Sequence, residues 1–168
     1  FIQSGMPQIY QVFSDYISKF VWPRRLHATH LDAIFTHDRR NKHRNAGHIK
    51  AQASDLLSLA SVLALFTQTV LLPMGPTCAA ACTAFLSLIE VIDLIRSAPR
   101  VTVPPAMMLA AVEKCLQLIS SAFGFDKMTP KFHWMLHFHS QLEKYKIMLN
   151  CFCLERKHRA PKRYCTEF

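Results

Sequence analysis

Apolar residues recur every three or four positions along most of the chain, which is the spacing of an amphipathic helix. The first such series ends before Pro23 and consists of Ile9, Val12, Phe13, Tyr16, Ile17 and Phe20. A proline disfavours helical backbone in the residue before it, so we expect this helix to end there. A second helix is expected over 24–37. The polar run 37–48 has no apolar period and predicts a solvent-exposed loop.

The apolar middle of the chain predicts three further helices. The first begins at Ser54 or Asp55, either of which can cap it, and runs to Leu72. The other two cover 77–96 and 105–123. Prolines and glycines separate the three segments, since proline suits the start of a helix and glycine its end.

Two more helices are expected over about 129–145 and about 154–164, the second of them bent or shortened by Pro161. Sustained alternation of apolar and polar residues, the pattern of a strand, is absent from the sequence. The sequence therefore predicts an all-α fold, an irregular bundle of about five to seven helices. We divide it into residues 1–48, with N-terminal helices and a basic loop, and a helical region over 49–168.

The apolar run 56–72 raises the question of a membrane span. A spanning helix needs about 20 consecutive, predominantly apolar residues. This run is shorter and contains serines, threonines and Gln68, and no aromatic belt flanks it. We therefore expect a helix buried in the protein, and no membrane partner.

The net charge of +9 on 168 residues is concentrated at the two ends of the chain. Residues 19–50 contain eight lysines and arginines but only two aspartates, and residues 131–168 contain eight lysines and arginines but only three glutamates. The middle of the chain is nearly neutral. Basic clusters attract polyanions, which makes nucleic acid or an anionic membrane surface the expected partner. The alternative is that these charges only keep an apolar protein in solution. The apolar share of 51% excludes a disordered chain.

The chain begins with Phe1 and has no secretory leader pattern, so we expect an intracellular, nuclear or other non-secreted protein and a piece of a longer reading frame. Free thiols are then the expected state of its cysteines. Cys78, Cys82 and Cys115 lie in predicted apolar helices, where cysteine acts as a small hydrophobic residue.

His133 and His137 are four residues apart on a predicted helix, so both can face one metal ion. Trp134 stands where a zinc protease would have its glutamate, and Cys151 and Cys153 are candidates for further ligands. The other interpretation, which the sequence favours, is that these histidines cap or pack at a helix contact. Gly-rich phosphate loops and nucleophile motifs are absent from the sequence.

Glu155 is a single carboxylate within a strongly basic segment that contains Arg156, Lys157, His158, Arg159, Lys162 and Arg163. A carboxylate beside phosphate-binding cations suits Mg²⁺-dependent phosphoryl transfer. One carboxylate does not make a two-metal site, however, so the residues alone favour an ion pair with Arg159 at the i,i+4 spacing.

The C-terminal third resembles the corresponding region of CACTA/En-Spm-type DDE transposases and related transposon-derived open reading frames. The similarity covers about 49–164, but only 130–163 is motif-specific. The matching residues are Pro130, Lys131, His133, Leu136, His137, Glu155, Lys157, His158 and Lys162. Phe138 replaces the proline of the family pattern, and Lys146–Ile147 replaces its Gly-Pro turn, which indicates a divergent or decayed copy.

The resemblance implies that Glu155 is the last metal-binding carboxylate of an RNase H-like active site, where it would hold Mg²⁺ in the parent enzyme. The two preceding aspartates would belong to a catalytic core outside these 168 residues. We therefore expect a helical region that accompanies such a core and contacts the DNA backbone. The expected contacts are Arg39, Arg40, Lys42, Arg44, Arg156, Lys157, His158, Arg159, Lys162 and Arg163.

Two other functions are compatible with the sequence. One is a helical protein-interaction or scaffold module that does not bind nucleic acid. The other, which is the least favoured, is a membrane-associated protein inserted through 56–95.

We predict that isolated residues 1–168 neither cleave nor transfer DNA strands, because one carboxylate cannot position two Mg²⁺ ions. The measurement is incubation of the purified chain with a terminal-repeat duplex and Mg²⁺. Cleavage by the chain that disappears in Glu155→Gln would contradict this prediction.

Overall fold

The computed structural model describes residues 7–22 and 32–148, and helices joined by short connections make up most of these ranges. The α-helices are α1 (Pro7–Lys19), α2 (His37–Ala46), α3 (Ala53–Phe66), α4 (Ala79–Ser97), α5 (Pro105–Phe123), α6 (Pro130–Met135) and α7 (Phe138–Tyr145). A single 3-10 turn, η2 (Asp32–Phe35), precedes α2. The described residues contain no strand, so the predicted all-α class is confirmed.

The helix α3 does not stop at Phe66 but widens into a π-helical turn, η3 (Thr67–Leu71). The hydroxyls of Thr67 and Thr69 donate to the carbonyls of Leu63 and Leu65, each at 2.8 Å. Such bonds from side chain to backbone carbonyl compete with the regular helical ladder and accompany its distortion. Short 3-10 turns η4 (Leu72–Met74) and η5 (Pro76–Cys78) then lead into α4.

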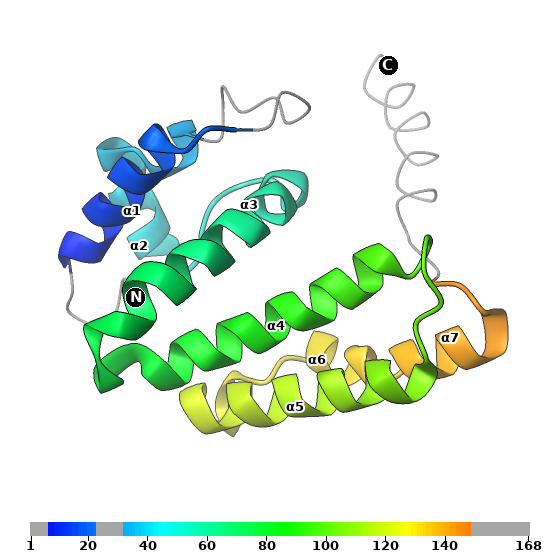
Figure 1. The fold of residues 1–168 in the computed structure, drawn as a ribbon. Coiled ribbons are helices and arrows are strands. Elements are labelled where there is room, and N and C mark those ends of the chain that lie inside the picture. Colours follow the sequence, from blue (N-terminus) through cyan, green and yellow to red (C-terminus); the bar gives the residue numbers. More distant parts are fainter. Residues whose placement is uncertain (1–6, 23–31, 149–168) are drawn as a thin grey trace, which may run out of the picture.

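Gly75 lies between these two turns, at the point where the chain reverses direction. Its φ of +114° falls in a region that side chains with a Cβ rarely adopt. The prediction that the first long apolar helix ends at the Pro73–Pro76 segment is therefore confirmed, and the chain returns along α3 as α4 (Figure 1).

Helices α4 and α5 pack side by side along most of their length, as Figure 1 shows in green and yellow-green. Pro104 precedes α5 and Pro105 occupies its first turn, where the missing N–H of proline costs no hydrogen bond. Between the two helices lies one core cluster, in which Val91, Met108 and Val112 are almost fully buried. Leu142 of α7 closes this cluster on the side away from α3.

A second core cluster holds α1 and η2 against α3. The Phe13 ring meets Phe35 edge-on, with centroids 4.7 Å apart, and lies 4.8 Å from Phe66. Leu59 of α3 and Ile17 of α1 complete its centre. This cluster joins residues on both sides of the boundary predicted between 48 and 49, and that division into domains stays a prediction.

Two segments differ from the sequence-based expectation. The expected loop 37–48 is the helix α2 as far as Ala46, and Gly47, in the left-handed region, ends it. The single helix expected over 129–145 is broken between α6 and α7. The His139 ring donates from Nδ1 to the Leu136 carbonyl at 2.6 Å, so that a side chain takes an acceptor that a continuous helix would use. The expected last helix, 154–164, lies outside the described residues.

Three helical segments, Ala53–Met74, Pro76–Ser97 and Pro105–Phe123, are long and apolar enough to cross a membrane, judged by length and composition only. The first is 22 residues long because α3 begins three residues before the apolar run 56–72, and η3 and η4 continue the helical segment to Met74. Its length therefore does not distinguish a buried helix from a span, and the expected absence of a membrane partner stays a prediction.

Replacing Leu59 by alanine should lower the free energy of unfolding by about 2–5 kcal/mol, because it leaves a cavity in a packed core. Leu59 is 0% exposed, whereas Leu65 on the same helix is 42% exposed. Leu65→Ala is the matched control and should change stability by less than about 1 kcal/mol. Urea unfolding followed by far-UV circular dichroism measures both. Equal losses in the two variants would contradict the packing described for α3.

Candidate functional site

The residues predicted to contact DNA fall into a described and an undescribed group. The structure brings Arg39, Arg40, Lys42 and Arg44 together on α2. The basic segment 156–163, the candidate catalytic Glu155, and the candidate zinc ligands Cys151 and Cys153 lie outside the described residues. The site is therefore built from α2, from the histidines of α6 and α7, and from the surface between α3 and α4.

The side chains of α2 are almost all polar, and its cations face solvent. Arg39, Lys42 and Arg44 are exposed. Neither of the ion pairs found between described residues, Lys114–Glu90 and Lys127–Asp126, involves a cation of α2. With Asp38 in the first turn and Arg44 in the last, the charges also suit the dipole of the helix.

Arg40 differs from the other three cations because it is half-buried. Its guanidinium carbon lies 6.0 Å from the centroid of the Tyr10 ring, at the limit of a cation–π contact. The Tyr10 hydroxyl donates to the Thr36 carbonyl at 3.2 Å, just before α2 begins. Burial raises the pKa of Tyr10, and the positive charges of Arg40 and Arg39 oppose that rise. Arg40 therefore links α2 to α1.

The connection that fixes α2 most firmly is His43, which is 0% exposed. The backbone N–H of Lys50 donates to its Nδ1 at 2.9 Å, so this nitrogen carries no proton. Its Nε2 lies 2.7 Å from the Ile34 carbonyl and must therefore carry the proton that it donates. One neutral imidazole thus ties the segment before α2 to the segment after it.

Sequence reasoning missed the role of His43, because a search for apolar periodicity gives no weight to a histidine inside a polar run. The residue faces Phe35 and Tyr10, whose ring centroids lie 6.1 Å and 6.3 Å from its own. A buried polar ring is stable there only because both of its nitrogens have partners. The residues next to His43 in the sequence do not indicate which groups its two ring nitrogens will bond to.

A second group of imidazoles lies where α6 meets α7. The Nε2 atoms of His133 and His137 are 3.4 Å apart, and both side chains are exposed. The structure therefore places these two candidate ligands together, as the i,i+4 spacing predicted. His139 points elsewhere, since its Nδ1 is bonded to Leu136 and its Nε2 lies 3.1 Å from the Ser140 hydroxyl. Among the described residues, no group of three histidines, cysteines or acids comes close enough to hold a metal.

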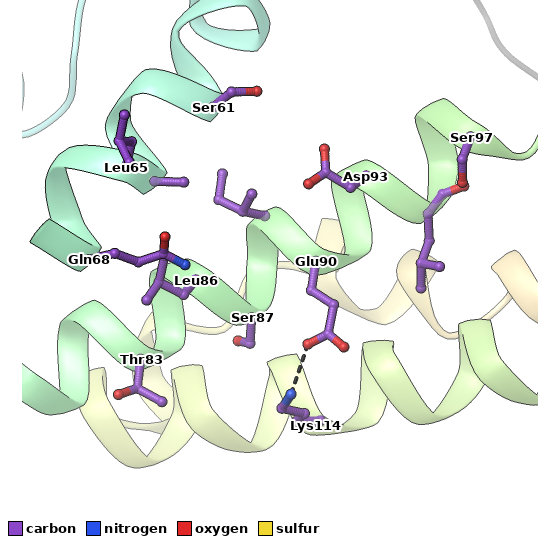
Figure 2. Close-up of a pocket in the computed structure, with 13 residues that line it drawn as sticks. Ser61, Leu65, Gln68, Thr83, Leu86, Ser87, Glu90, Asp93, Ser97 and Lys114 are labelled. Atoms are coloured by element: carbon purple, nitrogen blue, oxygen red, sulfur yellow. Dashed lines mark hydrogen bonds and ion pairs between the residues drawn. The ribbon is translucent and has the colours of Figure 1, made fainter.

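A cleft of about 870 Å³ separates the outer surfaces of α3 and α4. Figure 2 shows its lining: hydroxyl and amide groups from Ser61 and Gln68 on one side, and the carboxylates of Glu90 and Asp93 on the other. Lys114 of α5 donates to Glu90 at 2.8 Å across the α4–α5 contact. The carboxylate of Glu90 at the edge of the cleft is therefore engaged by a cation of the neighbouring helix.

Cys82 and Cys115 are buried in the core, as expected for cysteines that act as small hydrophobic residues. Burial raises the pKa of Cys82 to about 11, and the neighbouring Cys78 contributes to the rise. Burial likewise raises the pKa of Cys115. A thiol must lose its proton to act as a nucleophile or a metal ligand, so the raised pKa disfavours both roles for these two residues.

The chain was also compared with known proteins, and no family model, curated protein or solved structure matches it. The assignment of a function therefore depends on the residues and geometry described above.

Replacing His43 by alanine should lower the free energy of unfolding by about 2 kcal/mol or more, because it leaves the Ile34 carbonyl and the Lys50 N–H without their partner. Amide hydrogen exchange over 37–50 should become faster in the same variant. The control is His48→Ala, since His48 is exposed and contacts only the nearby Ala46 carbonyl among described residues. Unchanged exchange in His43→Ala would show that the imidazole does not hold α2.

Proposed function

We propose that this chain is the helical region of a transposon-derived, transposase-like protein, and that the exposed face of α2 contacts the phosphate backbone of DNA. The observation that carries the proposal is a helix with three exposed cations, Arg39, Lys42 and Arg44, fixed to the core by a fully buried histidine. The resemblance of 130–163 to the transposase pattern supports the class of protein, and the position of α2 supports the mode of contact.

A fixed basic helix suits phosphate better than a flexible basic loop does. Guanidinium groups bind phosphate through two parallel hydrogen bonds, and their geometry depends on where the backbone holds them. Because His43 and Arg40 anchor α2 on two sides, less conformational entropy is lost when its other cations meet a polyanion. Contacts of this kind position a protein on DNA and read little of the base sequence.

The second basic segment, Arg156, Lys157, His158, Arg159, Lys162 and Arg163, belongs to the same proposal by its charge and by its resemblance to the family. Glu155 would bind Mg²⁺ only together with the carboxylates of an RNase H-like core, which is the missing partner that we propose for this region. The chain alone is then a DNA-contacting region without catalysis, and its proposed location is nuclear or otherwise intracellular.

A protein-interaction or scaffold module is the second candidate function. The cleft between α3 and α4 favours it, since apolar side chains, hydroxyls and carboxylates line it together along an open surface. In this alternative the cations of α2 serve solubility, and the chain does not bind DNA.

Salt dependence of DNA binding tests the proposal. The affinity of 1–168 for a mixed-sequence duplex should fall steeply with salt, and Arg39→Gln/Lys42→Gln/Arg44→Gln should reduce the slope of log K against log[salt] by about three, or roughly 0.9 for each lost phosphate contact. The matched control, Arg96→Gln/Arg100→Gln/Lys127→Gln, removes the same charge from exposed positions outside α2. Fluorescence anisotropy between about 50 and 200 mM salt measures each slope.

Three results would contradict the proposal. Undetectable DNA binding at low salt supports the scaffold module. An equal reduction in both triple variants shows that net charge, and not α2, attracts the polyanion. Tighter binding to vesicles of anionic phospholipid than to DNA favours the membrane-associated alternative, for which three sufficiently long apolar helices are present.

A further inference from the structure

We propose that His133 and His137 form a two-histidine chelate for a divalent transition metal, with Zn²⁺ as the representative ion, across the joint between α6 and α7. Nothing in the proposed DNA contact requires this site, and it lies on different helices from the basic surface. The inference stands on the distance between the two imidazoles, on the partners of their neighbours and on their position at the break.

The separation of the two Nε2 atoms, 3.4 Å, matches the requirement of a tetrahedral ion. Zinc–nitrogen bonds are about 2.0–2.1 Å long, so two nitrogens at the tetrahedral angle lie about 3.3–3.4 Å apart. The same distance also corresponds to a long hydrogen bond between the rings, in which one Nε2 carries the shared proton. The pair is therefore close enough to share an ion, which would take the place of that proton.

The two nitrogens are also available. Both rings are exposed, and within the described part of the chain the hydrogen-bond partner of each Nε2 is the other Nε2. His139 provides the contrast, because the Leu136 carbonyl and the Ser140 hydroxyl engage both of its nitrogens. An imidazole binds a metal through an unprotonated nitrogen, so the first pair can supply ligands and His139 cannot without breaking its bonds.

Because of where this pair lies in the fold, a bound metal would affect how α6 and α7 are arranged. His133 belongs to α6, while His137 is the N-cap residue of α7. An ion held by both would fix the angle at which the two short helices meet. Only two protein ligands come from the described residues, so water completes the coordination and the ion exchanges readily.

Calorimetric titration of the full chain with ZnCl₂ tests the proposal. Cysteines 151, 153 and 165 would compete for zinc, so the titration is done in a background with all three changed to serine. We expect one zinc equivalent in this background, and binding at least about tenfold weaker in His133→Gln/His137→Gln, because loss of an outer-shell partner alone costs about 10–100-fold in metal affinity. The matched control, His48→Gln, replaces an exposed histidine outside the α6–α7 joint and should bind as the background does.

Amide hydrogen exchange over 130–145 supplies a second measurement that does not depend on calorimetric affinity. Zinc should slow exchange across the α6–α7 joint in the background protein and in His48→Gln, and should leave the double variant unchanged. Zinc binding of equal strength in the double variant, or no binding in the background protein, would overturn the proposal. Circular dichroism of each variant establishes that helix content is retained, which the exposure of both rings leads us to expect.

Discussion

Burial of the apolar faces of α3, α4 and α5 is the constraint on which the rest of the structure depends. More than half of the residues in each of these helices are hydrophobic, and each helix needs a partner on more than one side. Helix α4 meets α5 along its length, while α3 turns its own core residues toward α1 and η2. A small contact of Ala60 and Ala64 with Ile89 joins the two halves. The open cleft beside this contact follows from the same arrangement, since α3 and α4 each use most of their apolar surface elsewhere.

The cations of α2 are held in place because polar contacts attach this helix to the apolar framework. Helix α2 has too few apolar residues to pack on its own, and an isolated helix of its length is marginal in water. The imidazole of His43 replaces the missing hydrophobic face with two hydrogen bonds inside the core. A cluster of cations that would repel one another in a free peptide is thereby held in one place, and the proposed contact with a polyanion depends on this placement.

Much of the fold could be predicted from the sequence, because the apolar residues of a long helix recur every three or four positions and prolines or glycines mark its ends. The helices over 77–96 and 105–123 correspond to α4 and α5 within a few residues. The sequence failed where a single side chain decides the backbone: His43 stabilises a helix that hydropathy describes as a loop, and His139 takes the carbonyl at which a longer helix breaks. The candidate site was predictable in its residue types, but the engagement of Arg40 by Tyr10 depends on residues 30 positions apart.

The residues that carry the family resemblance have different physical roles where the structure describes them. Pro130 opens α6 at the position that tolerates proline, and Leu136 packs against the core between α4 and α5. Those two residues are explained by folding alone. Lys131, His133 and His137 are exposed, and the core of the described residues does not require them. The sequence favoured histidines that cap or pack at a helix contact, and the structure agrees in part: His137 is the N-cap residue of α7, and its ring meets that of His133 edge-on, with centroids 5.1 Å apart. Both rings are nevertheless exposed and their Nε2 atoms face each other, which is the arrangement that the proposed metal site uses.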